Sequence, residues 1–167
     1  MLYSRSAEYA IRALVHIATL PRDEYVMART IAANTEIPSH FLAKILQDVA
    51  REGLLKSIKG PGGGFRLALP ASEIPLLRVI EAVDGPARLQ RCPMGLGECT
   101  DRSLCGMHDS WKLLQSRIIE YTGATSVADV AESLLKKSTP QASDKAREKN
   151  RPLAHPRRRA GNRGSAR

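Results

Sequence analysis

The sequence predicts a mainly α-helical protein with one small β-hairpin, and two patterns support this fold class. Apolar residues recur at helical spacing in six segments of the 167-residue chain. Between the third and fourth segments, two alternating apolar runs flank a turn of glycine and proline, which is typical of a hairpin. With 43% apolar residues the chain can bury a core, so we expect one folded domain with an appendage.

Three helices are expected ahead of the hairpin, over residues 4–20, 26–33 and 38–52. The third begins at Pro38 and Ser39, two residue types that are common at helix starts. The short break between the second and third helices favours a helix-turn-helix arrangement.

The hairpin follows directly, with strands expected at 54–58 and 65–69 around the turn at 59–64. Four glycines in this turn would let its backbone approach another molecule closely. Helix, turn, helix and hairpin in this order form a winged helix-turn-helix. With a further helix at 74–83, we assign this module to residues 1–83.

DNA contacts are predicted at two places in such a module, because its third helix lies in the major groove. On that helix the candidates are Ser39, His40, Lys44, Gln47 and Arg51. At the wing, where cations suit a narrow minor groove, the candidates are Lys59, Gly62, Gly63 and Arg66. The alternative is a common packing unit whose charged side chains are merely solvated.

The chain has three cysteines, which form one cluster with the spacing C-x6-C-x5-C-x2-H from Cys92 through Cys99 and Cys105 to His108. This cluster lies in a loop expected over 84–106. Thiolate and imidazole groups are ligands of zinc and of iron–sulfur clusters. An odd number of clustered cysteines argues against a secreted disulfide framework, so the cytoplasm is the expected compartment.

The C-terminal part combines two helices with a charged tail. A long helix is expected over 107–121, and a last helix, capped by Ser126, over 126–135. The rest of the chain balances its charges, so the whole net charge of +9 lies in residues 136–167. The tail at 138–167 is predicted to be disordered, and its cations suit a sequence-independent DNA contact.

Three stretches of the chain resemble the iron–sulfur cluster regulator (IscR) and nitrite-sensitive repressor (NsrR) family of bacterial winged-helix regulators. They are SAEYAIRALVHIA at 6–18, IPSHFLAKILQDVAREGLLKSIKGPGGGFRLA at 37–68, and CPMGLGECTDRSLCGMHDSW at 92–111. The wing segment KGPGGGF and the ordered cysteine triplet are specific in combination. The gap between Cys92 and Cys99 is slightly longer than is usual in the family.

The resemblance implies a homodimer on a palindromic double-stranded DNA operator, with residues 107–137 supplying a long dimerisation helix and a terminal helix. It also implies an iron–sulfur cluster, with 2Fe–2S favoured over 4Fe–4S, on the three cysteines. A fourth ligand would come from His108 or from Glu8 in the first helix. The implied function is a transcription regulator, with repression favoured, that senses redox state, nitric oxide or iron–sulfur supply.

Two other interpretations of the cysteines stay open. Zinc could occupy the same ligands and stabilise a winged-helix interaction module. Alternatively, the thiols could form a redox regulator that needs no cluster. No enzyme is expected, since the sequence shows no nucleophile motif and no paired carboxylates. No stretch reaches the roughly 18 consecutive apolar residues of a membrane span.

Overall fold

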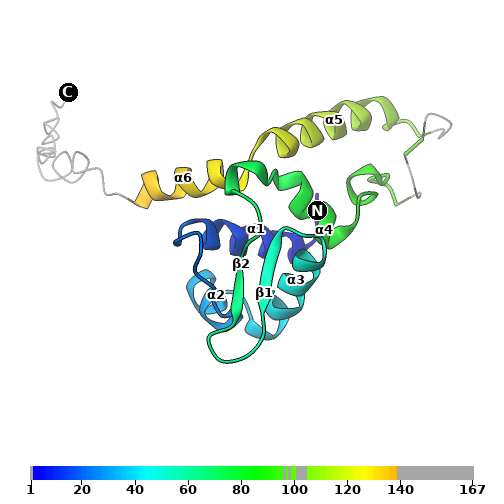
Figure 1. Ribbon diagram of the computed structural model, residues 1–167. Helices are drawn as coiled ribbons and strands as arrows, with labels where there is room; N and C mark the ends of the chain where they lie inside the picture. The colour runs from blue at the N-terminus through cyan, green and yellow to red at the C-terminus, as the bar shows by residue number, and fades with distance from the viewer. Residues whose placement is uncertain (1, 96, 98, 101–104, 139–167) are drawn as a thin grey trace, which may run out of the picture.

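Figure 1 shows the computed structural model, which describes residues 2–95, 97, 99–100 and 105–138. Within these residues, six α-helices and one two-stranded antiparallel sheet follow each other in the predicted order. The mainly α fold with a small hairpin is thus confirmed, with boundaries that differ from the predicted ones by at most three residues. Residues 139–167 of the predicted tail lie outside the described residues. No described helix is long and apolar enough to cross a membrane.

The helices are α1 (Arg5–Ala18), α2 (Ala28–Thr35), α3 (Ser39–Arg51), α4 (Leu76–Asp84), α5 (His108–Ala124) and α6 (Val127–Ser138). The hairpin consists of β1 (Leu55–Ile58) and β2 (Gly64–Leu67). Two 3-10 turns, η1 (Ala71–Glu73) and η2 (Arg88–Gln90), lie before and after α4.

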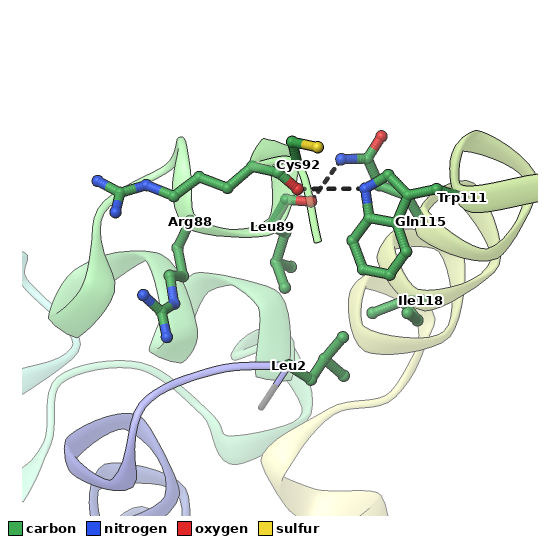
Figure 2. A pocket seen from close by; sticks show the side chains of 8 residues that line it. Leu2, Arg88, Leu89, Cys92, Trp111, Gln115 and Ile118 are labelled. Atoms are coloured by element: carbon green, nitrogen blue, oxygen red, sulfur yellow. Dashed lines mark hydrogen bonds between the residues drawn. The ribbon is translucent and has the colours of Figure 1, made fainter. Parts of the chain in front are cut away.

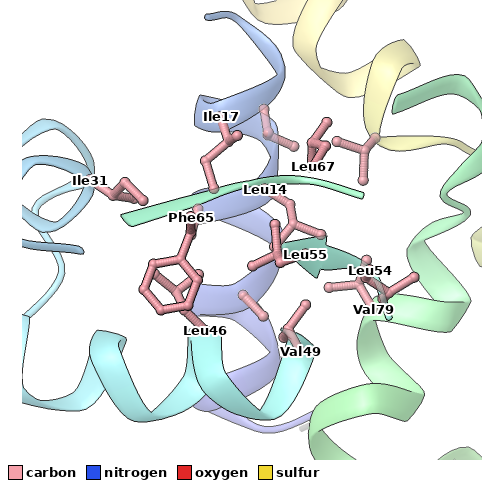
Figure 3. Packing of buried hydrophobic residues seen from close by; sticks show 14 of the residues in the cluster. Leu14, Ile17, Ile31, Leu46, Val49, Leu54, Leu55, Phe65, Leu67 and Val79 are labelled. Atoms are coloured by element: carbon pink, nitrogen blue, oxygen red, sulfur yellow. The ribbon is translucent and has the colours of Figure 1, made fainter. Parts of the chain in front are cut away.

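The core forms around α1, against which α2, α3, α4 and α6 all pack. Three fully buried alanines of α1 let these neighbours approach closely, namely Ala7, Ala10 and Ala13. Figure 3 shows side chains from α1, α3, α4 and the hairpin meeting in one apolar cluster. Leu14, Leu42 and Leu46 have no exposed area, and burying each contributes about 1.5–3 kcal/mol to folding.

The hairpin is anchored by a third segment, the connection between α1 and α2. The Val26 amide donates to the Phe65 carbonyl at 3.0 Å, and the Phe65 amide donates to the Val26 carbonyl at 2.9 Å. The predicted alternation of the first strand was wrong, because Leu54 and Leu55 are both buried and residues 56–58 are exposed. The second strand stays buried up to the turn, through Gly64 and Phe65, whereas the first strand is exposed beyond Leu55.

The last helix returns to the core of the winged module. Val127 and Ala131 are buried members of the main apolar cluster. The Val127 amide donates to the Ile74 carbonyl, and the Leu76 amide donates to the Thr125 carbonyl, both at 2.9 Å. This helix, α6, was predicted as part of a C-terminal segment at 107–137. It packs on α1, which lies far from it in the chain.

The long helix α5 packs on α4 and η2 but buries little of its surface. Its two buried residues are polar, namely Gln115 and Thr122. Leu113, Leu114 and Tyr121 are each more than half exposed. In Figure 1 this helix lies on the opposite side of the molecule from the tip of the hairpin.

Candidate DNA interface and cysteine loop

The exposed face of α3 presents every polar candidate that the sequence predicts on this helix. The apolar side of α3 is buried through Leu42, Ile45, Leu46 and Val49. Helical spacing turns the opposite side outward, and five residues there are exposed, namely Ser39, His40, Lys44, Gln47 and Arg51. One of them is already paired, since Arg51 lies 2.8 Å from Asp48. The Arg51 side chain is 70% exposed in this pair, so the pair contributes little to stability.

Two of the four glycines in the wing turn have different roles. Gly62 is exposed and has a φ of +75°, a conformation that favours glycine. Gly63 is buried, and a Cβ there would lie 2.3 Å from the Ile58 carbonyl oxygen. Gly62 is therefore available at the surface, whereas Gly63 closes the turn. The adjacent Lys59 is exposed.

Arg66, predicted as a DNA contact, lies against the connection between α1 and α2. Its guanidinium lies 5.1 Å from the centre of the Tyr25 ring and 3.6 Å from an Asp23 carboxylate oxygen. Hydrogen bonding to Tyr25 raises the pKa of Arg66 above its ordinary value. Its side chain is only 22% exposed, so Arg66 fixes the wing to the rest of the module.

The cysteine loop is held mainly by backbone hydrogen bonds. The Cys92 amide donates to the Gly97 carbonyl at 2.9 Å, and the Cys99 amide donates to the Gln90 carbonyl at 3.3 Å. Cys92 and Cys99 are buried, and Cys105 is half-buried. All three are free thiols in this structure.

The structure brings two of the predicted ligands together. His108 Nδ1 lies 3.3 Å from Cys99 Sγ, and the His108 amide donates to the Cys105 carbonyl at 3.0 Å. Among the residues that the structure describes, no group of three metal-ligating side chains is assembled. Glu8 lies in the first turn of α1 and forms an ion pair with Arg12 at 3.7 Å.

The same loop is hydrogen-bonded directly to α5 (Figure 2). Trp111 Nε1 donates to the Arg91 carbonyl at 3.1 Å, and Gln115 Nε2 donates to the Leu89 carbonyl at 2.5 Å. Between loop and helix lies a cavity of about 180 Å³, with Cys92 on its wall. A change in the conformation of the loop would therefore move the two carbonyl groups that accept hydrogen bonds from α5.

A family model described as Rrf2, iron-dependent transcriptional regulator, matches residues 3–133. The chain belongs to the Rrf2 family. A relative in Aquifex aeolicus, described as an HTH-type transcriptional regulator, is 32% identical over 132 residues, which cover 78% of this chain and 91% of the relative. A Mycobacterium tuberculosis relative with the same description is 34% identical over 145 residues, 86% and 89% of the two chains. IscR of Vibrio campbellii is 31% identical over 121 residues, 72% and 71% of the two chains.

Solved structures show the same fold at lower identity. CymR, the global cysteine regulator of B. subtilis, is 20% identical, with a TM-score of 0.68 over 80% of this chain and 98% of CymR. T. potens IscR is 18% identical, with a TM-score of 0.66 over 85% of this chain and 94% of that protein. The family match and these relatives identify the Rrf2 protein as a DNA-binding transcription regulator and not an enzyme, as the sequence predicted.

One buried carboxylate of this Rrf2 protein joins the winged module to the cysteine loop. Asp84, at the end of α4, accepts hydrogen bonds from the amide of Ser4, at 2.7 Å, and from the Ser4 hydroxyl. Ser4 is the N-cap of α1. Asp84 also lies 3.9 Å from Arg88 Nε in η2, near the start of the loop. Its side chain is 6% exposed, so Asp84 links α1, α4 and η2 from a buried position.

Sequence reasoning missed four residues of this Rrf2 protein that the structure places at the two sites. They are Phe41 on α3, Asp84 at the end of α4, and Trp111 and Gln115 on α5. An isolated polar residue in an apolar helix pattern could have indicated Gln115. The others have ordinary sequence surroundings, and only the folded arrangement gives them their contacts.

Proposed function

We propose that this Rrf2 regulator binds a palindromic operator as a homodimer and that an iron–sulfur cluster on Cys92, Cys99 and Cys105 sets its affinity for DNA. The observation that supports this proposal most is the hydrogen bonding of the cysteine loop to α5 through Trp111 and Gln115. A sensor needs such a connection between the place that reacts and the element that moves.

The donor set fits an iron–sulfur cluster by its chemistry. Three thiols on one loop are the usual protein ligands, and a 2Fe–2S cluster is favoured over 4Fe–4S. When bound, the cluster supplies a redox centre that reacts with oxygen or nitric oxide. For the fourth ligand we propose His108, because its Nδ1 already lies 3.3 Å from Cys99 Sγ. Glu8 is the weaker candidate, since it pairs with Arg12.

Ligation would have a direct structural consequence at the start of α5. His108 is the first residue of that helix, so drawing it toward the thiols would shift the first turn. Cys92 directly follows Arg91, whose carbonyl accepts from Trp111, and Cys92 lines the cavity between the loop and α5. We therefore expect the loaded loop to hold α5 in one position and the empty loop to release it.

Dimerisation through α5 is proposed from its exposed apolar side chains. Leu113, Leu114 and Tyr121 are 65%, 52% and 65% exposed, which is unusual for a helix without a partner. Next to Tyr121 lies a groove of about 450 Å³ between α5, α1 and α4, lined mainly by apolar residues. A second copy is proposed to pack here, and on a palindromic operator the two copies of α3 would have to reach half-sites about one helical turn of DNA apart, roughly 34–36 Å.

On DNA, we propose that α3 contacts the major groove through Ser39, His40, Lys44, Gln47 and Arg51. The wing would contribute Lys59 and the backbone around Gly62. Arg66 is assigned to holding the wing in place, because it is engaged by Tyr25 and Asp23.

A thiol-based regulator without a cluster is the second candidate function. The contact between Cys99 and His108 supports it, because reactive cysteines of proteins commonly lie beside a histidine or another basic side chain. Zinc on the same four side chains would serve as a structural site instead.

Anaerobic purification followed by iron, sulfide and zinc analysis distinguishes these candidates. We expect iron and acid-labile sulfide in equal amounts, visible absorbance, and loss of both in a Cys92→Ser variant. Met94→Ser, an exposed substitution in the same loop, is the control and should keep the iron. A colourless protein with one zinc per chain, or a metal-free protein that still responds to oxidants, would contradict the cluster proposal.

A further inference from the structure

Phe41 is an exposed aromatic residue on a helix whose other large apolar side chains are buried. Phe41 lies in the first turn of α3 and is 56% exposed. The ring of His40 lies beside it, with 4.1 Å between ring centres and 42° between ring planes. Exposing a phenyl ring to water is unfavourable, so an apolar contact outside the chain would explain its position.

The spacing of α3 places Phe41 at the border of the exposed face. It lies one turn before Lys44, which is exposed, and before Ile45, which is buried. Side chains in a helix lean toward its N-terminus, so Phe41 and His40 together cover the first turn of α3. The first turns of a recognition helix are the part that enters the major groove.

The major groove offers few apolar groups to a phenyl ring, and the C5-methyl group of thymine is the one that identifies a base. We propose that Phe41, supported by His40, reads a thymine methyl group in each half-site of the operator. This inference rests on the proposed role of α3 as the DNA-reading helix. It adds an apolar, base-specific contact to the polar contacts of Lys44 and Gln47.

A second copy of the chain is a less suitable partner for Phe41. The exposed apolar side chains of α5 already offer a surface for it, and Figure 1 shows α5 separated from α3 by the body of the molecule. The neighbours of Phe41 on the exposed face are His40 and Lys44, which suit a nucleic acid better than an apolar protein surface.

The test uses the full-length protein and duplexes that it selects from a pool of random 30-base-pair DNA. In a selected duplex, each thymine is replaced in turn by deoxyuridine, which removes the methyl group and leaves the hydrogen-bonding edges unchanged. We expect one symmetry-related thymine in each half-site whose replacement weakens wild-type binding about fourfold per methyl group, the effect of burying one apolar carbon.

The variant Phe41→Ala should bind the thymine duplex more weakly than the wild type and should not distinguish thymine from deoxyuridine at that position. Gln47→Ala is the matched control on the same helix, and it should keep the fourfold discrimination whatever affinity it loses. Phe41→Leu, which keeps an apolar side chain, should keep part of the discrimination and guards against a folding defect in the alanine variant.

Two outcomes would overturn the inference. One is equal discrimination between thymine and deoxyuridine in wild type and Phe41→Ala, whatever affinity the variant loses, and the other is the absence of any methyl-sensitive position. If the wild type selects no duplex from the pool, the proposed DNA-reading role of α3 fails first. This result differs from one in which DNA is selected but Phe41 does not contact a thymine, so the two failures can be told apart.

Discussion

The winged module and the segment from the cysteine loop to α5 are built in opposite ways. In the module, Leu14, Leu42 and Leu46 are completely buried and several helices enclose them. In α5, the described buried residues are Gln115 and Thr122, which are both polar. The module is therefore held by an apolar core, to which α6 also contributes, whereas α5 buries little apolar surface and is joined to the loop by a few hydrogen bonds. A segment held in this way can respond to a ligand or to a second copy without unfolding the module.

The largest expected effect is on the free energy of unfolding, when one leucine from each region is replaced by alanine. Leu46→Ala removes a fully buried side chain and should lower the free energy of unfolding by about 2–5 kcal/mol. Leu113→Ala, at a side chain that is 65% exposed, should change it by less than about 0.5 kcal/mol in a monomeric protein. Chemical denaturation at low protein concentration measures both values. A comparable loss in the two variants would show that α5 belongs to the core.

Asp84 joins the two regions, so its removal should affect both. Asp84→Asn places an amide donor against Ser4 and removes the charge that faces Arg88, with an expected cost of about 1.5–3 kcal/mol. Hydrogen exchange should increase at the start of α1 and in η2. Glu73→Gln, at an exposed residue of η1, is the control and should leave exchange unchanged. An effect limited to one of the two segments would argue against Asp84 as a link.

Within the module, alanine substitutions at two glycines of the hairpin should differ in their effects on stability and hydrogen exchange. A Cβ at Gly64 would lie 2.3 Å from the Val26 carbonyl oxygen, so Gly64→Ala should break the pairing with the connection between α1 and α2. Losing its two hydrogen bonds should cost about 1–3 kcal/mol, with faster exchange of the Phe65 amide. Gly62→Ala meets open space and should show only the backbone strain of a positive φ, about 1 kcal/mol. Equal exchange in the two variants would contradict the anchoring role of Val26.

The smallest expected effect concerns the cap of α6. Asp129 accepts hydrogen bonds from the Ser126 hydroxyl at 2.7 Å and from the Ser126 amide at 2.8 Å, which lower the pKa of Asp129 below its ordinary value. A lowered pKa in the folded state stabilises the protein above the ordinary carboxyl pKa of about 3.9, and this contribution disappears as the pH falls through the folded value. Asp129→Asn should therefore lower the melting temperature slightly at pH 7, and this effect should shrink as the pH falls below about 3.9. In a Ser126→Ala background the substitution should have a smaller effect at pH 7.

The sequence predicted the module well because its helices follow simple apolar periodicities. Ser126 was also predicted as a cap, and its hydroxyl accepts a hydrogen bond from the Asp129 amide at 3.2 Å. The destination of Arg66 was not predictable, because its partners Tyr25 and Asp23 lie about forty residues earlier in the chain. The role of Gln115 depends on a backbone carbonyl in the loop, which no side-chain pattern reveals.

The cysteine spacing identified the candidate loop but not its geometry. Cys99 and His108 lie nine residues apart, and the structure brings them within 3.3 Å of each other. The fold determines which donors meet, since the loop backbone is fixed by bonds to Gln90 and Gly97 rather than by the thiols themselves. Spacing alone could therefore not rank His108 above Glu8.

The most direct test of the central claim is the affinity for operator DNA of anaerobically loaded protein, compared with the same preparation after removal of iron by a chelator. We expect a change of about fivefold or more, within the usual range of coupling between two sites, and no change in a variant with serine at Cys92, Cys99 and Cys105. Equal affinities before and after chelation, or the same change in the serine variant, would contradict control of DNA binding by the cysteine loop.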